Sequence, residues 1–354
     1  MSQLYVGVDV GRTTTTVSVG NESREVLMVS EQFDTRSTDG PQAAVASIVE
    51  NICKCVRSVE GDPCHIKSIG LATPGPATRD GVLGKTPNLK AAEWEDFPIR
   101  AALEEAMKEH QSEIKVHYLG DGQAAALGEY AVRSQKVHWS EIEVHEEDAT
   151  DLSTIFMVVV GTGLGGGEVR SGHVVRGIEG RAGHVGHILL PDYAFRYPHD
   201  RELVVGNATC SAESAISLTS LTHQLAYRLT LDEWKDHPLN SVDGTPKDRA
   251  KKLRGLAAEG DPLAMELFMD QAAAMGITLL SLNYLGDYDL LVIGGGICDL
   301  ADDVKDAYRL KAEETYRKYA LKSFKNLDRI EFSTCGDNAP VIGALAHLYL
   351  RSLS

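Results

Sequence analysis

The sequence predicts an α/β protein with two lobes. Its 354 residues are more than one hydrophobic core usually holds, so two domains are expected. Strand-like and helix-like segments alternate over the first 125 residues, as they do in a layered α/β fold. A second apolar strand at residues 154–160 then runs into glycines and a hairpin, which repeats the plan of the N-terminus. We therefore expect a first lobe over residues 1–125 and a larger second lobe over residues 126–340.

The first lobe is expected to start with three strands. β-branched and alternating residues favour strands at 4–8, 13–19 and 25–33. The patterns that follow predict, in order, a helix from Asp39-Gly40-Pro41 to about residue 58, a strand at 67–72, a helix at 99–110 and a strand at 114–119. A C-terminal helix at about 341–354 could pack back on this lobe.

The second lobe is expected to be mixed, with helices in its central part. An acidic stretch at residues 136–151 is interpreted as a surface loop near the boundary between the lobes. The patterns then predict, in order, the strand at 154–160, a hairpin at 168–176, a loop at 191–209, helices at 212–228, 246–259 and 262–282, a strand at 289–293, a helix at 300–319, a strand at 330–333 and an apolar helix ending at 350.

Charge and composition exclude several classes of function. The formal net charge of −16 argues against a nucleic-acid partner, because binding a phosphate backbone needs a basic face. The six cysteines form no paired framework and indicate reduced thiols. The N-terminus begins with a strand and has no basic leader, and no apolar run of about 20 residues is seen. A cytoplasmic protein without a membrane partner is therefore expected, and a helix-turn-helix has no room before residue 4.

Asp121 lies where a predicted strand meets a predicted helix. The strand ends in Gly120-Asp121-Gly122, and an alanine-rich segment with high helix propensity follows to Glu129. The carboxyl ends of strands are where open α/β sheets place their ligands, so Asp121 is a candidate functional carboxylate. An aspartate at this position could also serve as a helix cap alone.

Three glycine turns follow predicted strands. They are Asp9-Val10-Gly11-Arg12-Thr13, Gly161-Thr162-Gly163 and Gly294-Gly295-Gly296. Successive amides in such turns can bind phosphates, although glycine after a strand often serves the turn alone. None of the three matches a Walker A loop or the full dinucleotide-binding spacing. In so acidic a chain they suggest a nucleotide bound with Mg²⁺, with Asp9 acting on the ion through water or simply capping its turn.

A series of motifs in this order resembles the ROK family of sugar kinases and sugar-responsive repressors. The motifs are Asp9-Val-Gly-Arg-Thr, Thr73-Pro-Gly-Pro, Pro87-Asn-Leu, Asp121-Gly-Gln-Ala-Ala-Ala-Leu-Gly-Glu, Gly161-Thr-Gly-Leu-Gly-Gly-Gly, Gly183-His-Val-Gly-His and Val292-Ile-Gly-Gly-Gly. The resemblance implies a two-lobed actin-like ATPase fold, related to ribonuclease H, whose lobes close on ATP and a sugar. It also implies a homodimer.

The resemblance assigns roles to individual residues. Asp121 would be the general base that accepts the proton of the attacking sugar hydroxyl. The nucleotide and its Mg²⁺ would be bound at Asp9, Gly11, Thr13, Gly161, Thr162, Gly163, Gly294, Gly295 and Gly296. The sugar would be bound at Gly75, Asn88, His184, His187 and Glu213.

Departures from the family pattern concentrate at sugar-contact positions. Gly120 replaces an asparagine before the catalytic aspartate, His184 replaces a glutamate, and Gln123 replaces a second asparagine. The family's zinc motif is also incomplete, because only His187 and a single cysteine, Cys210, remain, so no structural metal is expected.

The sequence hypothesis is an ATP- and Mg²⁺-dependent kinase that acts on a hexose, as glucokinases do. Because of the departures at Gly120 and His184, an N-acetylhexosamine or an unusual polyol is an alternative substrate. The alternative is a non-catalytic sugar or nucleotide sensor of the same fold. A third class, chaperone-like or cytoskeletal relatives of actin, predicts ATP turnover without sugar.

Overall fold

The computed structural model describes residues 3–84, 92–142, 152–325 and 329–351. The chain forms two compact units. Unit 1 comprises Met1–Met157, Gly167–Gly183 and Thr334–Ser354, and unit 2 comprises Val158–Gly166 and His184–Ser333. The first segment of unit 1 thus ends at residue 157, whereas the sequence predicts a lobe boundary at residue 125.

Unit 1 is built on a six-stranded sheet. Its strands are β1 (Leu4–Val10), β2 (Thr14–Asn21), β3 (Val26–Val29), β4 (Phe33–Asp34), β5 (Ile66–Thr73) and β6 (Val116–Gly120). The order is β3-β2-β1-β5-β6, and β4 pairs with β2. β1 runs antiparallel to β2 and parallel to β5, and β5 runs parallel to β6. The carboxyl ends of β1, β5 and β6 therefore meet at one edge of the sheet.

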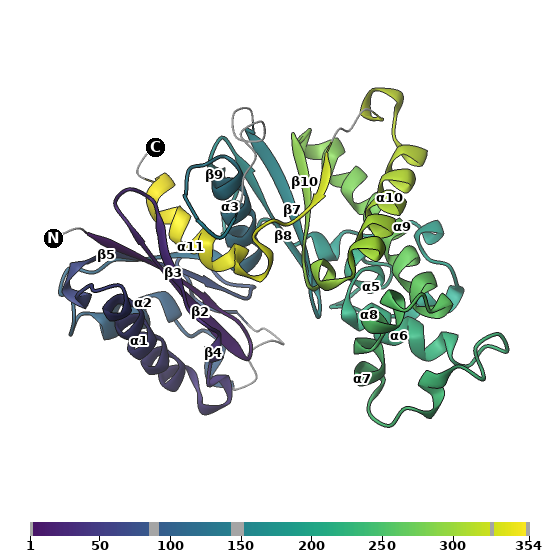
Figure 1. Ribbon diagram of the computed structural model, residues 1–354, viewed down its shortest axis with the longest axis horizontal. Helices are drawn as coiled ribbons and strands as arrows, with labels where there is room; N and C mark the ends of the chain where they lie inside the picture. The colour runs from purple at the N-terminus through teal and green to yellow at the C-terminus, as the bar shows by residue number, and fades with distance from the viewer. Residues whose placement is uncertain (1–2, 85–91, 143–151, 326–328, 352–354) are drawn as a thin grey trace. The chain divides into compact units, whose positions relative to one another are not determined.

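Helices cover both faces of this sheet (Figure 1). On one face, α1 (Pro41–Ser58) and α2 (Ile99–Met107) bury apolar side chains in a core that they share with β1, β2 and β5. On the other face lie α3 (Asp121–Arg133) and the C-terminal helix α11 (Ala339–Leu350), which pack on each other. α11 also packs on β1 and β5, and a Cβ at Gly70 of β5 would clash with the carbonyl oxygen of Ala344. Glycine at position 70 thus lets this helix approach the sheet closely.

Unit 2 carries most of the second sheet and a group of helices. The sheet has the order β11-β10-β7-β8-β9, and its strands β7 and β8 each cross a unit boundary in sequence. The strands are β7 (Thr154–Val160), β8 (Leu164–Arg170), β9 (His173–Val174), β10 (Leu290–Gly295) and β11 (Ile330–Phe332). The helices are α5 (Ala212–Ala215), α6 (Leu218–Arg228), α7 (Pro246–Lys251), α8 (Leu253–Ala258), α9 (Pro262–Gly286) and α10 (Asp302–Tyr319).

Three predicted elements are interrupted by polar residues, and one of them is the helix predicted at 246–259, which is divided into α7 and α8 at Lys252. The strand predicted at 25–33 is divided into β3 and β4, because the exposed Glu31 and Gln32 leave the ladder. The helix predicted at 212–228 is divided into α5 and α6. The first part ends at Ala215, and Ser217 caps the second, since its hydroxyl accepts a hydrogen bond from the amide of Ser220 at 3.0 Å. The acidic stretch predicted at 136–151 lies partly outside the described residues.

Helix α9 corrects the expectation that no apolar segment reaches membrane-spanning length. It has 25 residues and a mean hydropathy of 1.3 over its most apolar 18-residue window, which is enough by length and composition alone. However, 72% of that window is buried inside the protein. α9 is therefore apolar on nearly all sides because other elements of unit 2 surround it, as in a buried core helix.

Candidate active site

Asp121 occupies the junction that the sequence predicts. β6 ends at Gly120 and α3 begins at Asp121, so the carboxylate lies at the carboxyl end of the sheet. The side chain is exposed, and its Oδ1 accepts a hydrogen bond from the amide of Gly122 at 2.7 Å. Gly120 is the N-cap residue and makes no side-chain capping bond, so Asp121 is not the helix cap, and its carboxylate lies at the surface, where a ligand can reach it.

Gln123, two residues after Asp121, forms hydrogen bonds with other parts of unit 1. This residue is 3% exposed, and its Nε2 donates to the carbonyl oxygens of Gly180 at 3.1 Å and Ala182 at 2.9 Å. Its Oε1 accepts from the amide of Gly120 at 3.4 Å. The side chain therefore ties the segment 180–182 to the N-terminus of α3.

Asp9 brings a second carboxylate close to Asp121. It belongs to β1 and pairs with Ala72 of β5 in the register of the sheet. Burial raises the pKa of Asp9 to about 7, and the negative charges of Asp121 and Asp337 contribute to this rise. Three carboxylates thus influence one another at this edge of unit 1, and they form the group that we call the acidic edge.

Asp337 was not predicted as a site residue. It lies in a short 3₁₀ helix, Gly336–Asn338, directly before α11. The same order of features that marks Asp121 was present in the sequence, because a strand, a glycine, an aspartate and a helix follow one another here as well. The contact with Asp9 depends on the return of the C-terminal segment to the first sheet, over more than 300 residues, which local patterns do not reveal.

Glu129 fixes the segment that carries Asp337. Its side chain is fully buried in α3 and forms an ion pair with Arg133 at 2.7 Å. The same carboxylate accepts hydrogen bonds from the amide and hydroxyl of Thr334, both at 2.8 Å, and from the amide of Cys335 at 3.2 Å. The buried charge is thereby satisfied, and α3 is tied to the residues before Asp337.

The turn after β1 has the features of an anion site. Thr35 and Ser37 donate their hydroxyls to the carbonyl oxygens of Gly11 at 3.0 Å and Arg12 at 2.8 Å. Within the described part of the chain, the amides of Arg12 and Thr13 donate to no protein acceptor. Because its carbonyls are held by the protein, this turn can present amides to an anion.

The turn Gly161-Thr162-Gly163 in unit 2 is built in a similar way. Its carbonyls at 161 and 162 accept from the amides of Leu218 at 3.0 Å and Thr219 at 3.3 Å, the first residues of α6. Among the residues that the structure describes, the amides of Thr162 and Gly163 have no protein acceptor. The turn is therefore a second candidate for binding phosphate.

Glu213 braces this turn. Its Oε2 accepts from the amide of Leu164 at 2.8 Å, and a Cβ at Gly163 would lie 2.6 Å from the same oxygen. Glycine at 163 therefore leaves room for the carboxylate. A role of Glu213 in binding sugar was predicted, and the structure adds this structural contact.

The third turn, Gly294–Gly296, follows β10 and is shaped by its backbone. Gly295 has a φ of +79°, and a Cβ there would collide with the carbonyl oxygen of Val160. Only glycine fits such a conformation and such a close approach without strain. The structural reason for this glycine is thus sufficient by itself, and a role in binding nucleotide stays a prediction.

The predicted sugar-binding residues come from both units. Gly75 follows β5 in unit 1, and Asn88 lies outside the described residues. His184, His187 and Glu213 belong to unit 2. The two histidines are exposed, and their rings are nearly parallel with centroids 6.3 Å apart.

No group of three or more histidine, cysteine or acidic side chains suited to a metal ion is found in residues 3–84, 92–142, 152–325 and 329–351. Cys210 contacts the carbonyl oxygen of Arg201 through Sγ at 3.8 Å. His199 stacks between His223 and Tyr227, with centroid distances of 4.1 and 4.3 Å. The side chains of His199 and Cys210, near the incomplete zinc motif, are thus positioned by ring stacking and by a polar contact.

Two relatives show the range of functions among similar proteins. The chain is 26% identical over 348 residues to a glucokinase of Halalkalibacterium halodurans. The alignment covers 96% of this chain and 93% of that protein. It is 23% identical over 352 residues to a xylose repressor of Caldicellulosiruptor bescii. That alignment covers 99% of this chain and 79% of the repressor. Kinases and repressors are thus both among its relatives.

Two solved structures share the fold. A ROK hexokinase from Thermus thermophilus matches with a TM-score of 0.74 and 26% identity, over 99% of both chains. A ROK family glucokinase from Streptomyces griseus, solved with glucose and AMPPNP, matches with a TM-score of 0.70 and 23% identity, over 97% of this chain and 98% of that one. The predicted two-lobed actin-like ATPase fold is confirmed by these matches. The sequence pattern of the ROK family matches residues 5–350, and the chain therefore belongs to the ROK family.

Proposed function

We propose that this protein is an ATP-dependent sugar kinase that phosphorylates a hydroxyl of a hexose, with Asp121 as general base. The observation that carries the proposal is the position of Asp121, at the carboxyl end of β6 and beside Asp9, in a chain of the ROK family. The glucokinase relative supports the same reaction class.

The proposed reaction needs a base and a phosphate-binding frame. The Asp121 carboxylate accepts the proton of the sugar hydroxyl as that oxygen forms a bond to the γ-phosphorus of ATP. The bond between the γ-phosphorus and the β,γ-bridging oxygen breaks, and ADP leaves with that electron pair. The amides of the turns after β1 and β7 would bind the phosphates, since their carbonyls are held by the protein.

The acidic edge fits a hydrated divalent cation. Burial and like charge raise the pKa of Asp9, so a cation beside this carboxylate would relieve a repulsion that is built into the fold. Asp9 would act on Mg²⁺ through the ion's water shell, because Mg²⁺ keeps several waters and binds few carboxylates directly, and because no three side chains of the described residues are grouped to ligate an ion. Bound Mg²⁺ would neutralise charge on the phosphates of ATP.

The acceptor is proposed to be bound by Gly75, Asn88, His184, His187 and Glu213. Gly120 removes one amide side chain next to Asp121, and His184 can donate as well as accept hydrogen bonds. Amino sugars and polyols therefore belong in any substrate panel beside hexoses. A cytoplasmic homodimer is proposed as the working form.

Replacing Asp121 with Asn tests the proposed base. Turnover of the sugar-dependent reaction should fall about 10²- to 10⁴-fold, the usual contribution of general acid or base catalysis. Asp303→Asn is a matched control, because Asp303 also lies in the first turn of a helix and accepts from the next amide, at 2.9 Å. Retained turnover in Asp121→Asn, or an equal loss in Asp303→Asn, would rule out the assignment.

A sugar sensor without catalysis is the second candidate, and the repressor among the relatives favours it. A sensor should bind a sugar, with a measurable shift in melting temperature, yet release no ADP with any member of the panel. A kinase should do both.

A further inference from the structure

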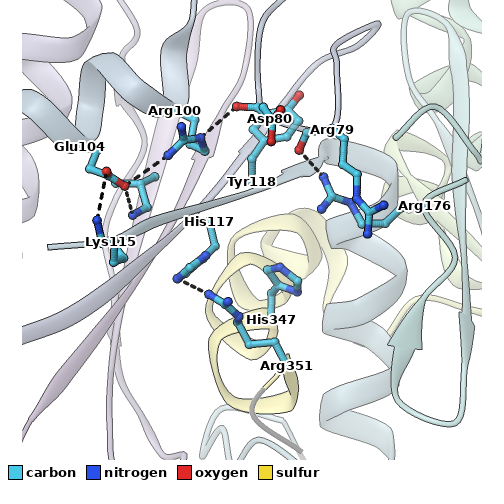
Figure 2. Close-up of a pocket in the computed structure, with 11 residues that line it drawn as sticks. Arg79, Asp80, Arg100, Glu104, Lys115, His117, Tyr118, Arg176, His347 and Arg351 are labelled. Atoms are coloured by element: carbon cyan, nitrogen blue, oxygen red, sulfur yellow. Dashed lines mark hydrogen bonds and ion pairs between the residues drawn. The ribbon is translucent and has the colours of Figure 1, made fainter. Parts of the chain in front are cut away.

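A cavity of about 430 Å³ opens beside the edge strand β6 of unit 1 (Figure 2). Its walls come from segments that are distant in sequence, namely the loop after β5, helix α2, strand β6, the segment after β9 and helix α11. We call it the basic pocket, and its charged or titratable residues are Arg79, Asp80, Arg100, Glu104, Lys115, His117, Tyr118, Arg176, His347 and Arg351. None of these residues was predicted as part of the kinase site.

The lining is strongly cationic in a protein whose net charge is −16. Four arginines and one lysine face two carboxylates, which leaves a net charge of +3 with neutral histidines. Glu104 is also engaged, because it pairs with Arg100 at 3.2 Å and Lys115 at 3.7 Å and accepts from the amide of Val116 at 3.0 Å. The remaining excess of positive charge is centred on Arg79, Arg176 and Arg351.

Arg79 and Arg176 form a like-charge pair. Arg176 donates through Nη2 to the carbonyl oxygen of Arg79 at 2.8 Å, so the two residues are in contact (Figure 2). Burial and the charge of Arg79 lower the pKa of Arg176. Nε of Arg176 is buried and has no hydrogen-bond partner, and the guanidinium of Arg79 makes no ion pair within the described residues. A buried donor without an acceptor is costly, and an anion here would supply one.

Two histidines complete the lining as neutral donors. The pKa of His347 is lowered to about 3, and that of His117 to about 4, chiefly because burial disfavours the charged ring, with further lowering by nearby arginines. His117 accepts a hydrogen bond from Nη1 of Arg351 through Nε2, so its Nδ1 carries the proton. The pocket therefore offers N–H donors of several kinds and few acceptors.

We propose that the basic pocket binds the phosphate group of a small molecule, at a place separate from the predicted site of phosphoryl transfer. Paired guanidinium groups with planar donors suit phosphate oxygens particularly well. The volume exceeds that of inorganic phosphate alone and leaves space for a phosphate monoester the size of a sugar phosphate. The proposal does not depend on kinase activity, because it rests on the charges and contacts of unit 1.

Calorimetric titration of the full chain with inorganic phosphate, and separately with glucose 6-phosphate, tests the proposal. Arg79→Ala should weaken binding at least tenfold, because it removes one member of the pair that faces the ligand. This variant should fold normally, since the Arg79 side chain is exposed and its carbonyl contact to Arg176 is retained. Arg79→Lys keeps the charge and should recover part of the affinity.

Arg57→Ala is the matched control, because it removes one exposed positive charge from unit 1 outside the pocket. It should leave both affinities unchanged. Tighter binding of glucose 6-phosphate than of phosphate would identify a monoester as the ligand, and equal binding would identify the phosphate group alone. The proposal is overturned if neither probe binds at millimolar concentration, if Arg79→Ala binds like wild type, or if Arg57→Ala weakens binding as much as Arg79→Ala does.

Discussion

Strand β6 carries opposite electrostatic environments at two places. Near its carboxyl end, Asp121 and Asp337 face Asp9, and the pKa of Asp9 is raised to about 7. Along its open edge, arginines surround His117 and His347, and the pKa values of both rings are lowered. The first place is the acidic edge and the second is the basic pocket.

The same physical arrangement prepares a site for a cation at one place and a site for an anion at the other. At each place, like charges are gathered on a rigid frame and partly buried, which costs free energy until a counter-ion arrives. The acidic edge is thereby prepared for a cation, and the basic pocket for an anion. The four predictions that follow test this comparison in order of expected size.

Removing Glu129 should have the largest effect, because it breaks the frame of the acidic edge. Glu129→Ala removes the buried carboxylate that pairs with Arg133 and that accepts hydrogen bonds from Thr334 and Cys335. The free energy of unfolding should fall by about 3–5 kcal/mol. Urea denaturation measures this loss. Glu105→Ala is the control, because its solvent-exposed pair with Lys108 should contribute little to stability, and an equal loss in the two variants would contradict the prediction.

Asp9→Asn should remove a pH dependence of stability. Folded Asp9 keeps its proton up to a pKa of about 7, whereas the unfolded group loses it near 3.8. Wild-type stability should therefore fall as pH rises through this window, by on the order of 3 kcal/mol, and then level off. Urea denaturation at pH 4.5 and pH 8, without divalent cations, should show this fall for wild type and a flatter profile for Asp9→Asn. Parallel profiles would show that the acidic edge carries no such repulsion.

His347→Asn should show the opposite pH dependence at the basic pocket. The pKa of His347 is about 3 when folded, and an unfolded histidine titrates near 6.5. Wild-type stability should thus be lost as pH falls below about 6.5, by roughly 2 kcal/mol at pH 5 from this ring. Thermal unfolding at pH 7 and pH 5 should show a smaller acid loss for His347→Asn. The exposed His173→Asn serves as control, and an unchanged acid loss in His347→Asn would contradict the account.

Gly163→Ala tests the turn Gly161-Thr162-Gly163 of unit 2. In this turn backbone amides, rather than charged side chains, would attract the phosphates of a nucleotide. The added Cβ would lie 2.6 Å from Oε2 of Glu213, so stability should fall by about 1 kcal/mol or more and nucleotide affinity should weaken. Gly165→Ala is a close control, because nothing lies within 4 Å of its Cβ. Calorimetry with AMPPNP measures the affinity, and equal affinities in the two variants would remove the turn from the nucleotide site.

The sequence predicts the fold and the position of Asp121 because both depend on local order. Strand, glycine, aspartate and helix follow one another directly at residues 114–133, and the structure has the junction where the pattern indicates it. Asp337 shows the same order, yet its place beside Asp9 depends on the docking of α11 on the first sheet. Periodicity describes such a helix but not the face on which it packs.

The basic pocket could not be predicted for a similar reason. Arg79, Arg176 and His347 are about 100 or more residues apart in sequence, and each stands alone in an otherwise ordinary segment. The negative net charge of −16 also argued against an anion-binding site formed by side chains. A net charge describes the average of the surface, whereas a pocket depends on a few residues that the fold brings together.

The central claim is sugar phosphorylation, and ADP release measured across a panel of hexoses, N-acetylhexosamines and polyols tests it most directly. With ATP and Mg²⁺, the account predicts that at least one sugar accelerates ADP release, with one phosphorylated sugar formed per ADP and its carbon assigned by NMR. ADP release that is independent of every sugar, or no release at all, would contradict it.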